Sequence, residues 1–159
     1  MQESHTAPEW FVEQWLNTAP ALTLAALQGR VIVVGAFQML CPGCVSQLIA
    51  QLREAHAIFE RADVSVLGLH SVFEHHEAMG SISLKAFLYE NRITFPVAID
   101  QPQIPQNPIP KTMELYAMKG TPTLLLIDRK GNLRRQSFGH TTDMQLGAEI
   151  MSLLNERIV

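Results

Sequence analysis

The sequence predicts an α/β fold, in which helices flank a β-sheet. Apolar runs rich in β-branched residues alternate with segments whose apolar residues recur every three or four positions. Strand, helix and strand in that order indicate a parallel β-α-β unit. The chain has 159 residues, of which 47% are hydrophobic and 17% charged, and this fits one hydrophobic core. We therefore expect a single domain over residues 1–159.

Charge and hydropathy exclude several classes of function. The net charge is -3 and no basic cluster occurs, which argues against a nucleic-acid-binding protein. The apolar run Val31–Phe37 is far shorter than the roughly 20 residues of a membrane-spanning helix. Residues 1–14 contain no Lys or Arg and so lack the basic start of a secretory signal. We expect a cytoplasmic protein without a membrane span, or a periplasmic one if a signal peptide has been removed.

The first half of the chain gives an N-terminal extension, a central strand and a long helix. Residues 1–21 are expected to pack on the domain as an extension. Residues 31–34 are β-branched without alternation, as in a strand that is buried on both faces. A helix follows from Cys41, with Pro42 in its first turn. Its apolar face is expected to contain Val45, Leu48, Ile49, Leu52, Ala55 and Phe59.

The second half continues with strands at 63–69 and 95–99, separated by a helix over 83–91 that Ser83 caps. Four prolines between residues 100 and 111 predict a surface loop, although their spacing also matches a PxxP recognition motif. Strands at 123–128 and 133–138, joined by a turn at Gly131, form a hairpin. Thr142 and Gln145 form a capping box for the last helix.

The two cysteines, Cys41 and Cys44, carry the first functional information. A disulfide between them closes a very short loop and adds little stability, so redox chemistry is their more natural use. The start of a helix favours the thiolate of Cys41, which would attack a partner's disulfide. Cys44, one turn further on, would resolve the mixed disulfide. Pro42 and Gly43 between them would set the ring strain and hence the reduction potential.

Two other uses of the cysteines remain open. They could be inert core residues, or half of a metal site. Zinc normally takes four ligands, and the candidate histidines are His70, His75 and His76. The adjacent His75 and His76 point to different faces of a helix, and such pairs more often lie on a solvated surface. We therefore expect no metal at the cysteine pair, and keep a Cys/His metal-binding module as an alternative.

The order of these residues resembles a known superfamily. An apolar strand leads into Cys41-Pro42-Gly43-Cys44, and Gly120-Thr121-Pro122 follows much later, before another apolar strand. This order resembles the thioredoxin-like superfamily, and within it the TlpA-like and redoxin (AhpC/TSA-type) branch, over about residues 22–154. The resemblance implies a thioredoxin-like fold with a central mixed β-sheet flanked by helices. It also implies a thiol-disulfide oxidoreductase without a cofactor, acting on protein thiols or disulfides and supplied by an upstream dithiol reductant.

The resemblance also assigns a substrate platform. The proline that matches Pro122 is in the cis form in such proteins and packs against the cysteines, while the residue before it pairs with an extended substrate. Thr121 and Pro122 would therefore bind the substrate. Pro122 lies 78 positions after Cys44, more than a bare thioredoxin needs. This distance implies an insertion between the central strands, which we expect within residues 71–91.

Two departures from the thioredoxin pattern concern the site. Leu40 stands where thioredoxins usually carry Trp, and Gly35 stands where they bury an acid near the cysteines. The usual buried proton acceptor is therefore missing. His70 and Glu74 are candidate proton acceptors, because they follow the C-terminal end of a predicted strand, where sites in such sheets gather.

The redoxin branch also includes peroxiredoxins, so a thiol peroxidase is the main alternative function. Peroxiredoxins typically carry Pro and Thr seven and three residues before the reactive cysteine. Val34 and Gln38 occupy those positions here. This mismatch favours a thiol-disulfide oxidoreductase over a peroxidase.

Overall fold

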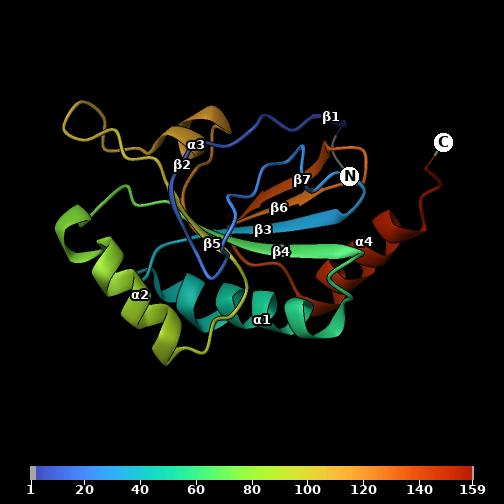
Figure 1. Ribbon diagram of the computed structural model, residues 1–159, viewed down its shortest axis with the longest axis horizontal. Helices are drawn as coiled ribbons and strands as arrows, with labels where there is room; N and C mark the ends of the chain where they lie inside the picture. Colours follow the sequence, from blue (N-terminus) through green and yellow to red (C-terminus); the bar gives the residue numbers. More distant parts are fainter. Residues whose placement is uncertain (1–2, 159) are drawn as a thin grey trace.

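The computed structural model describes residues 3–158, and a seven-stranded mixed β-sheet forms its centre (Figure 1). The strands are β1 (His5–Thr6), β2 (Val12–Leu16), β3 (Val31–Phe37), β4 (Val64–His70), β5 (Val97–Asp100), β6 (Thr123–Ile127) and β7 (Asn132–Phe138). The helices are η1 (Cys44–Leu48), α1 (Ile49–Ile58), η2 (His76–Ala78), α2 (Ser81–Glu90), α3 (Lys111–Leu115) and α4 (Asp143–Asn155). None of the helices in residues 3–158 is long and apolar enough to cross a membrane.

The strand order is β1-β7-β6-β3-β4-β5-β2. β3 pairs in parallel with β4, and β4 in parallel with β5, whereas β6 runs antiparallel to β3 and forms a hairpin with β7. These pairings confirm the mixed sheet flanked by helices and the β-α-β unit that the sequence predicts. Because β3 lies in the middle, all seven of its residues are buried.

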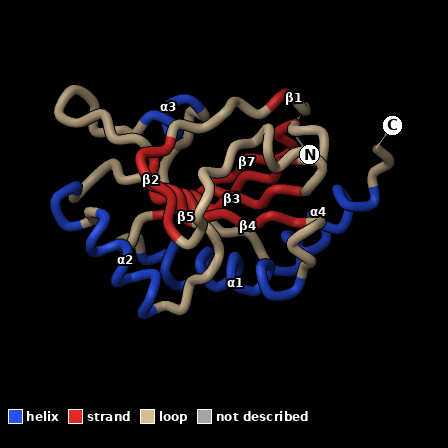
Figure 2. Tube along the Cα trace, viewed as in Figure 1, coloured by secondary structure: helices blue, strands red, loops and turns tan. Residues whose placement is uncertain are grey.

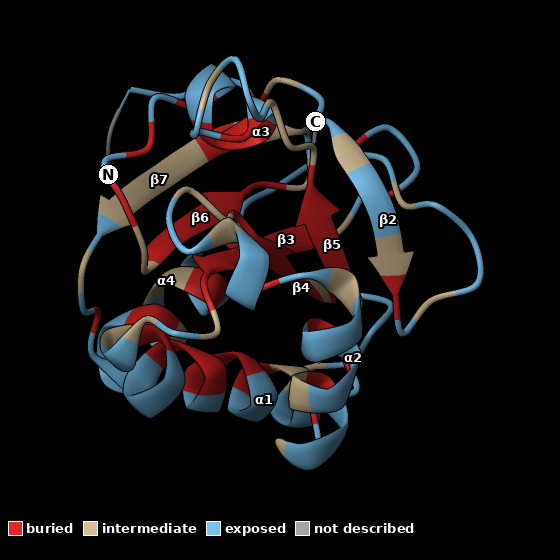
Figure 3. Cartoon of the chain, turned by 90° about the vertical axis from the view of Figure 1, so that its left-hand side faces the viewer, coloured by how far each residue is buried: buried red, intermediate tan, exposed pale blue. Residues whose placement is uncertain are grey.

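The sheet carries a hydrophobic cluster on each face. Figure 2 shows helices on both sides of the sheet. Helices α1, α2 and α4 cover one face, and α3 with the N-terminal segment covers the other. Successive residues of β3 serve opposite clusters, as Val33 packs toward α1 and Val34 toward α3. The absence of alternation in this strand follows from the two covered faces. Figure 3 shows the central strands buried and the outer strands β2 and β7 partly exposed.

The helix after β3 differs from the expected regular α-helix. Its first part, η1, is a π-helix, and α1 continues from it. The wider turn shifts the register, so that Cys44 and Leu48 face the core while Val45 is 40% exposed. The prediction that Val45 lies on the buried face was therefore wrong, whereas Leu48, Ile49, Leu52 and Ala55 are buried as expected.

Other boundaries also differ from expectation. α2 begins at Ser81 with Gly80 at its N-cap, so the cap expected from Ser83 is wrong. β5 begins at Val97 and not at residue 95. The proline-rich segment is a loop with one isolated bridge between Gln103 and Asn107, and it leads into α3, which the sequence pattern did not indicate.

The N-terminal segment supplies both edges of the sheet. β2 pairs antiparallel with β5 at one edge, and β1 pairs antiparallel with β7 at the other. Trp10, before β2, and Trp15, within β2, meet edge to face with ring centroids 6.0 Å apart and pack on the cluster that faces α3. The N-terminal segment thus contributes the outermost strand on each side of the sheet.

Candidate active site at Cys41 and Cys44

Cys41 and Cys44 lie at the C-terminal end of β3, where the chain turns into the helix. The carbonyl oxygen of Cys41 accepts the N–H groups of Cys44 and Val45, both at 3.1 Å, so Cys41 stands at the start of the first helical turn. Its thiol is partly exposed, whereas Cys44 has no exposed surface. Both thiols are free. This gives one accessible sulfur and one buried sulfur on the same turn.

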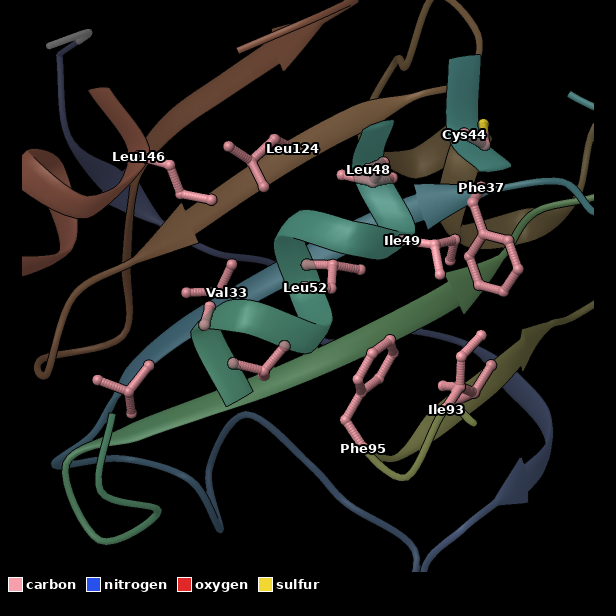
Figure 4. Packing of buried hydrophobic residues seen from close by; sticks show 14 of the residues in the cluster. Val33, Phe37, Cys44, Leu48, Ile49, Leu52, Ile93, Phe95, Leu124 and Leu146 are labelled. Atoms are coloured by element: carbon pink, nitrogen blue, oxygen red, sulfur yellow. The ribbon is translucent and has the colours of Figure 1, made fainter. Parts of the chain in front are cut away.

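Cys44 sits in the hydrophobic cluster beside Phe37 and Leu48 (Figure 4). Burial raises the pKa of its thiol to about 12, and the neighbouring Cys41 adds to the rise. The main chain of Gln38 and the side chain of Thr121 act in the opposite direction, because their hydrogen bonds favour the charged sulfur. Cys44 is therefore a neutral thiol at neutral pH, with two polar groups placed to support its thiolate.

The structure brings Thr121 and Pro122 against the cysteine pair. The Cys41 thiol donates to the carbonyl oxygen of Thr121 across 3.6 Å. The ring of Pro122 lies beside Gly43, since a Cβ at Gly43 would be 3.7 Å from the Pro122 Cδ. The Thr121–Pro122 peptide is cis. Pro42 is exposed on the outer side of the turn.

Neither His70 nor Glu74 forms a hydrogen bond or an ion pair with the cysteines. His70 is buried at the end of β4, where its Nε2 accepts the main-chain N–H of Met39 at 3.3 Å. Its ring lies 5.1 Å from that of Phe37, and burial lowers the pKa of His70 to about 4. Glu74 lies exposed in the following loop. His70 is therefore neutral at pH 7 and supports the loop before Cys41, and its Nε2 is not free to accept a proton from a thiol.

Gln38 is a site residue that sequence reasoning treated only as a mismatch to peroxiredoxins. Its side chain is 2% exposed and lies between two loops. Nε2 donates to the Thr121 hydroxyl at 3.3 Å, and Oε1 accepts the N–H of Phe73 at 3.2 Å. Its main-chain oxygen accepts the N–H of Cys41. A polar residue directly after a fully buried strand is the one signal in the sequence that could have indicated this role.

A second buried polar group, Asp100, holds the loop after β4 to α3. Its carboxylate accepts the Ser71 hydroxyl at 2.9 Å and the N–H groups of Thr112 and Met113 at 2.8 and 3.0 Å. Burial raises the pKa of Asp100, although these hydrogen bonds oppose the rise. The partners are distant in sequence, so no local pattern reveals the network.

Exposed apolar side chains lie next to Cys41 in the chain and beside Gly120, which precedes Thr121. Leu40 is 58% exposed next to Cys41, and Val45 lies on the following turn. Phe138, which is 57% exposed, packs over Gly120 and leaves no room there for a side chain, because a Cβ would approach its ring to 3.0 Å. We call Leu40, Val45 and Phe138 the apolar rim.

Among residues 3–158, no three His, Cys, Asp or Glu side chains gather as metal ligands.

Comparison with known proteins agrees with this geometry. Residues 4–136 match the AhpC/TSA family. The chain is 56% identical to a thioredoxin-like superfamily protein, SPOA0173, with a TM-score of 0.92 and 96% and 97% of the two chains covered. It is 45% identical to a thiol-disulfide isomerase from Corynebacterium glutamicum, with a TM-score of 0.90 and 94% and 96% covered.

A more distant structure, a thioredoxin-like protein in the oxidized form, shares the fold at 20% identity, with a TM-score of 0.77 and 97% of each chain covered. A search of curated proteins found no match. The family match spans most of the sequence, and the solved structures superpose over nearly the whole fold. The chain therefore belongs to the AhpC/TSA family of thioredoxin-like proteins.

Proposed function

We propose that the protein is a thiol-disulfide oxidoreductase in which Cys41 is the nucleophile and Cys44 the resolving thiol. The observation that carries this proposal is the pairing of a partly exposed Cys41 at a helix start with a fully buried Cys44 one turn later. Cys41 attacks a disulfide of a partner protein and forms a mixed disulfide, and Cys44 then displaces the partner. The partner's disulfide gains two electrons and two protons, and the Cys41–Cys44 pair becomes a disulfide.

The apolar rim and the Thr121–Pro122 loop support an extended protein segment as substrate. Leu40, next to Cys41 in the chain, and Phe138, beside Gly120, are more than half exposed, and a solvated apolar surface suits a partner's side chains. The carbonyl of Thr121, 3.6 Å from the Cys41 sulfur, lies close enough to align a partner's main chain with the reacting bond. We expect no bound cofactor, since the electrons come from a second dithiol protein.

Two cysteine variants test the proposal with a protein disulfide as substrate. Cys41→Ser should abolish exchange. Cys44→Ser should accumulate mixed disulfides, because the bond at Cys41 then has no internal thiol to displace the partner. Full multiple turnover by Cys44→Ser would contradict the two-cysteine mechanism.

The reduction potential of the pair decides the direction of electron flow. Equilibration in defined thiol buffers, with alkylation of the free thiols, gives this value. A potential near about -270 mV would indicate a reductant suited to the cytoplasm, and one near about -120 to -180 mV an oxidant or isomerase. Failure to form any internal disulfide would favour the metal-binding alternative.

Thiol peroxidase activity is the second candidate, because it occurs in the family that the sequence matches. Val34 packs into the cluster facing α3, and the amide of Gln38 is engaged by Thr121 and Phe73, so neither position offers the peroxide pocket of a peroxiredoxin. We expect the reduced protein to react with hydrogen peroxide no faster than an ordinary thiol. Rapid, saturating consumption of peroxide would reverse this ranking.

A further inference from the structure

The buried amide of Gln38 has a fixed orientation. The main-chain N–H of Phe73 can only donate, so the side-chain atom that faces it at 3.2 Å must be the oxygen. The Nε2 group is thereby left for Thr121, whose hydroxyl lies 3.3 Å away. Because Nε2 can only donate, the Thr121 oxygen must accept this hydrogen bond. The hydroxyl hydrogen of Thr121 then has to point elsewhere.

The sulfur of Cys44 is the ionisable group on which the Thr121 side chain acts. The Thr121 carbonyl lies 3.6 Å from the Cys41 sulfur, one helical turn before Cys44, and the Thr121 side chain favours the charged form of Cys44, as does the main chain of Gln38. A charged sulfur accepts hydrogen bonds strongly, whereas a neutral thiol accepts them weakly. The Gln38 amide thus fixes the Thr121 hydroxyl oxygen as an acceptor, and the same Thr121 side chain favours the Cys44 thiolate.

A buried thiolate needs such support, because β3 provides none. Gly35 faces α1, and a Cβ there would lie 2.5 Å from Leu52 Cδ1 and 3.1 Å from Leu48 Cδ2. The packing leaves no room for a carboxylate at this position. The polar groups that act on Cys44 come instead from the loops of Gln38 and Thr121.

We propose that Gln38 is a positioning residue that turns the Thr121 hydroxyl toward Cys44 and so stabilises the Cys44 thiolate in the resolving step. This inference rests on the proposed function. In that step the Cys44 thiolate attacks Cys41 Sγ, the Cys41–Cys44 bond forms and the bond to the partner breaks. The partner's sulfur leaves with the bonding electron pair and takes up the proton that Cys44 has lost to water.

The test is stopped-flow reaction of the reduced protein with 5,5′-dithiobis(2-nitrobenzoate), which releases a coloured thiolate twice. The first phase reports attack by Cys41, and the second reports displacement by Cys44. In Gln38→Met and Thr121→Val the second phase should be about 3- to 10-fold slower at pH 7, because a higher pKa lowers the thiolate fraction more than it raises nucleophilicity. Its pH profile should move to higher pH in both variants. Thr121→Ser keeps the hydroxyl and should restore the wild-type profile.

A double variant and a matched glutamine separate this role from a loss of structure. Because both residues act through one hydroxyl, Gln38→Met combined with Thr121→Val should be no slower in the second phase than Thr121→Val alone. Gln51→Met removes another buried glutamine, which lies in α1. Its side chain donates hydrogen bonds to the Thr141 carbonyl and to the Asp143 carboxylate at the start of α4. It should lower stability and leave the pH profile of the second phase in place.

Three outcomes would overturn the inference. They are a wild-type second-phase profile in Gln38→Met, effects of Gln38→Met and Thr121→Val that multiply in the double variant, and the same displacement in Gln51→Met. If the wild-type protein shows no second phase, the resolving mechanism itself fails. The hydrogen-bond chain is then judged by the alkylation of Cys44 in Cys41→Ser, where Gln38→Met should displace the pH profile upward and an unmoved profile would refute the chain.

Discussion

Gly35 shows how one missing side chain shapes the site. It lies within β3, and its side-chain direction is filled by Leu52 and Leu48 of the covering helix, both buried. Interiors pack at high density, so an added methyl group forces its neighbours to move. Close packing thus replaces the buried acid that thioredoxins carry here.

We expect Gly35→Ala to lower the free energy of unfolding by about 1–3 kcal/mol, because the new Cβ would overlap Leu52 Cδ1 at 2.5 Å. Urea unfolding of the reduced protein measures this. Gly147→Ala is the matched control: nothing lies within 4 Å of its added Cβ in α4, and alanine is the better helix former, so a gain of up to about 1 kcal/mol is expected. A Gly35→Ala variant as stable as the wild type would mean that Leu52 repacks freely.

His70 makes stability depend on pH. Burial lowers its pKa from 6.5 to about 4, so between these values the unfolded chain binds a proton that the folded chain does not. Acid therefore favours unfolding in this window, by about 1.4 kcal/mol per pH unit and about 3 kcal/mol in all. In His70→Gln this loss should disappear, while an oxygen remains to accept the Met39 N–H.

Urea midpoints between pH 4 and 7 for the two proteins give the comparison. Other titratable groups line the same cavity of about 420 Å³, among them Glu13, His76 and Asp100. Both proteins keep them, and the raised pKa of Asp100 acts in the opposite sense, so the difference between the two profiles isolates His70. Parallel profiles would show that His70 does not titrate with a lowered pKa.

At the scale of elements, the N-terminus of α4 shows half of the capping box that the sequence predicts. The Thr142 hydroxyl accepts the N–H of Gln145 at 3.2 Å, but the Gln145 side chain donates to Glu149. Thr142→Ala should therefore cost about 1 kcal/mol of stability, and Gln145→Ala only a few tenths. Chemical denaturation of the two variants checks the ratio. Equal losses would indicate that Gln145 also caps the helix in solution.

How far an element could be predicted follows from where its partners lie. β3, β4, the β6–β7 hairpin and α4 have patterns of their own and were found from the sequence, within a few residues at their ends. β2 was not, because it depends on pairing with β5, more than 80 residues later. α3 was also missed, because the groups that cap it are distant in sequence. The Asp100 side chain, at the end of β5, accepts the N–H groups of Thr112 and Met113 in its first turn.

The candidate site divides in the same way. The cysteine pair and the Thr121–Pro122 step are local motifs, so both could be identified from the resemblance to thioredoxin-like proteins. The position of Gln38 depends on Thr121, 83 residues away, and on Phe73, 35 residues away. No local pattern holds that information, so its role follows from the assembled loops alone.

At the scale of the whole molecule, the N-terminal segment forms the outermost strand on both sides of the sheet. Besides the pairing of β1 and β2, Phe11 exchanges hydrogen bonds with Thr112 at 2.8 and 3.0 Å, and Tyr116 donates its hydroxyl to the Pro8 carbonyl. These contacts tie the segment to α3 and the loop after it. Unpaired sheet edges invite pairing with other chains, and the two-residue β1 and the irregular β2 replace β7 and β5 as the edge strands, which protects the fold from self-association.

Removal of residues 1–17 should therefore leave β5 and β7 with free edges, lower the melting temperature and produce dimers or larger species. Removal of residues 1–6 alone takes away only β1, two exposed residues, and should change both properties far less. Light scattering coupled to gel filtration, together with thermal melts, measures the two effects. If the protein without residues 1–17 stays monomeric and has the melting temperature of the full-length protein, the N-terminal segment contributes neither stability nor edge protection. Loss of stability without association would mean instead that its packing on α3 matters more than the edges it covers.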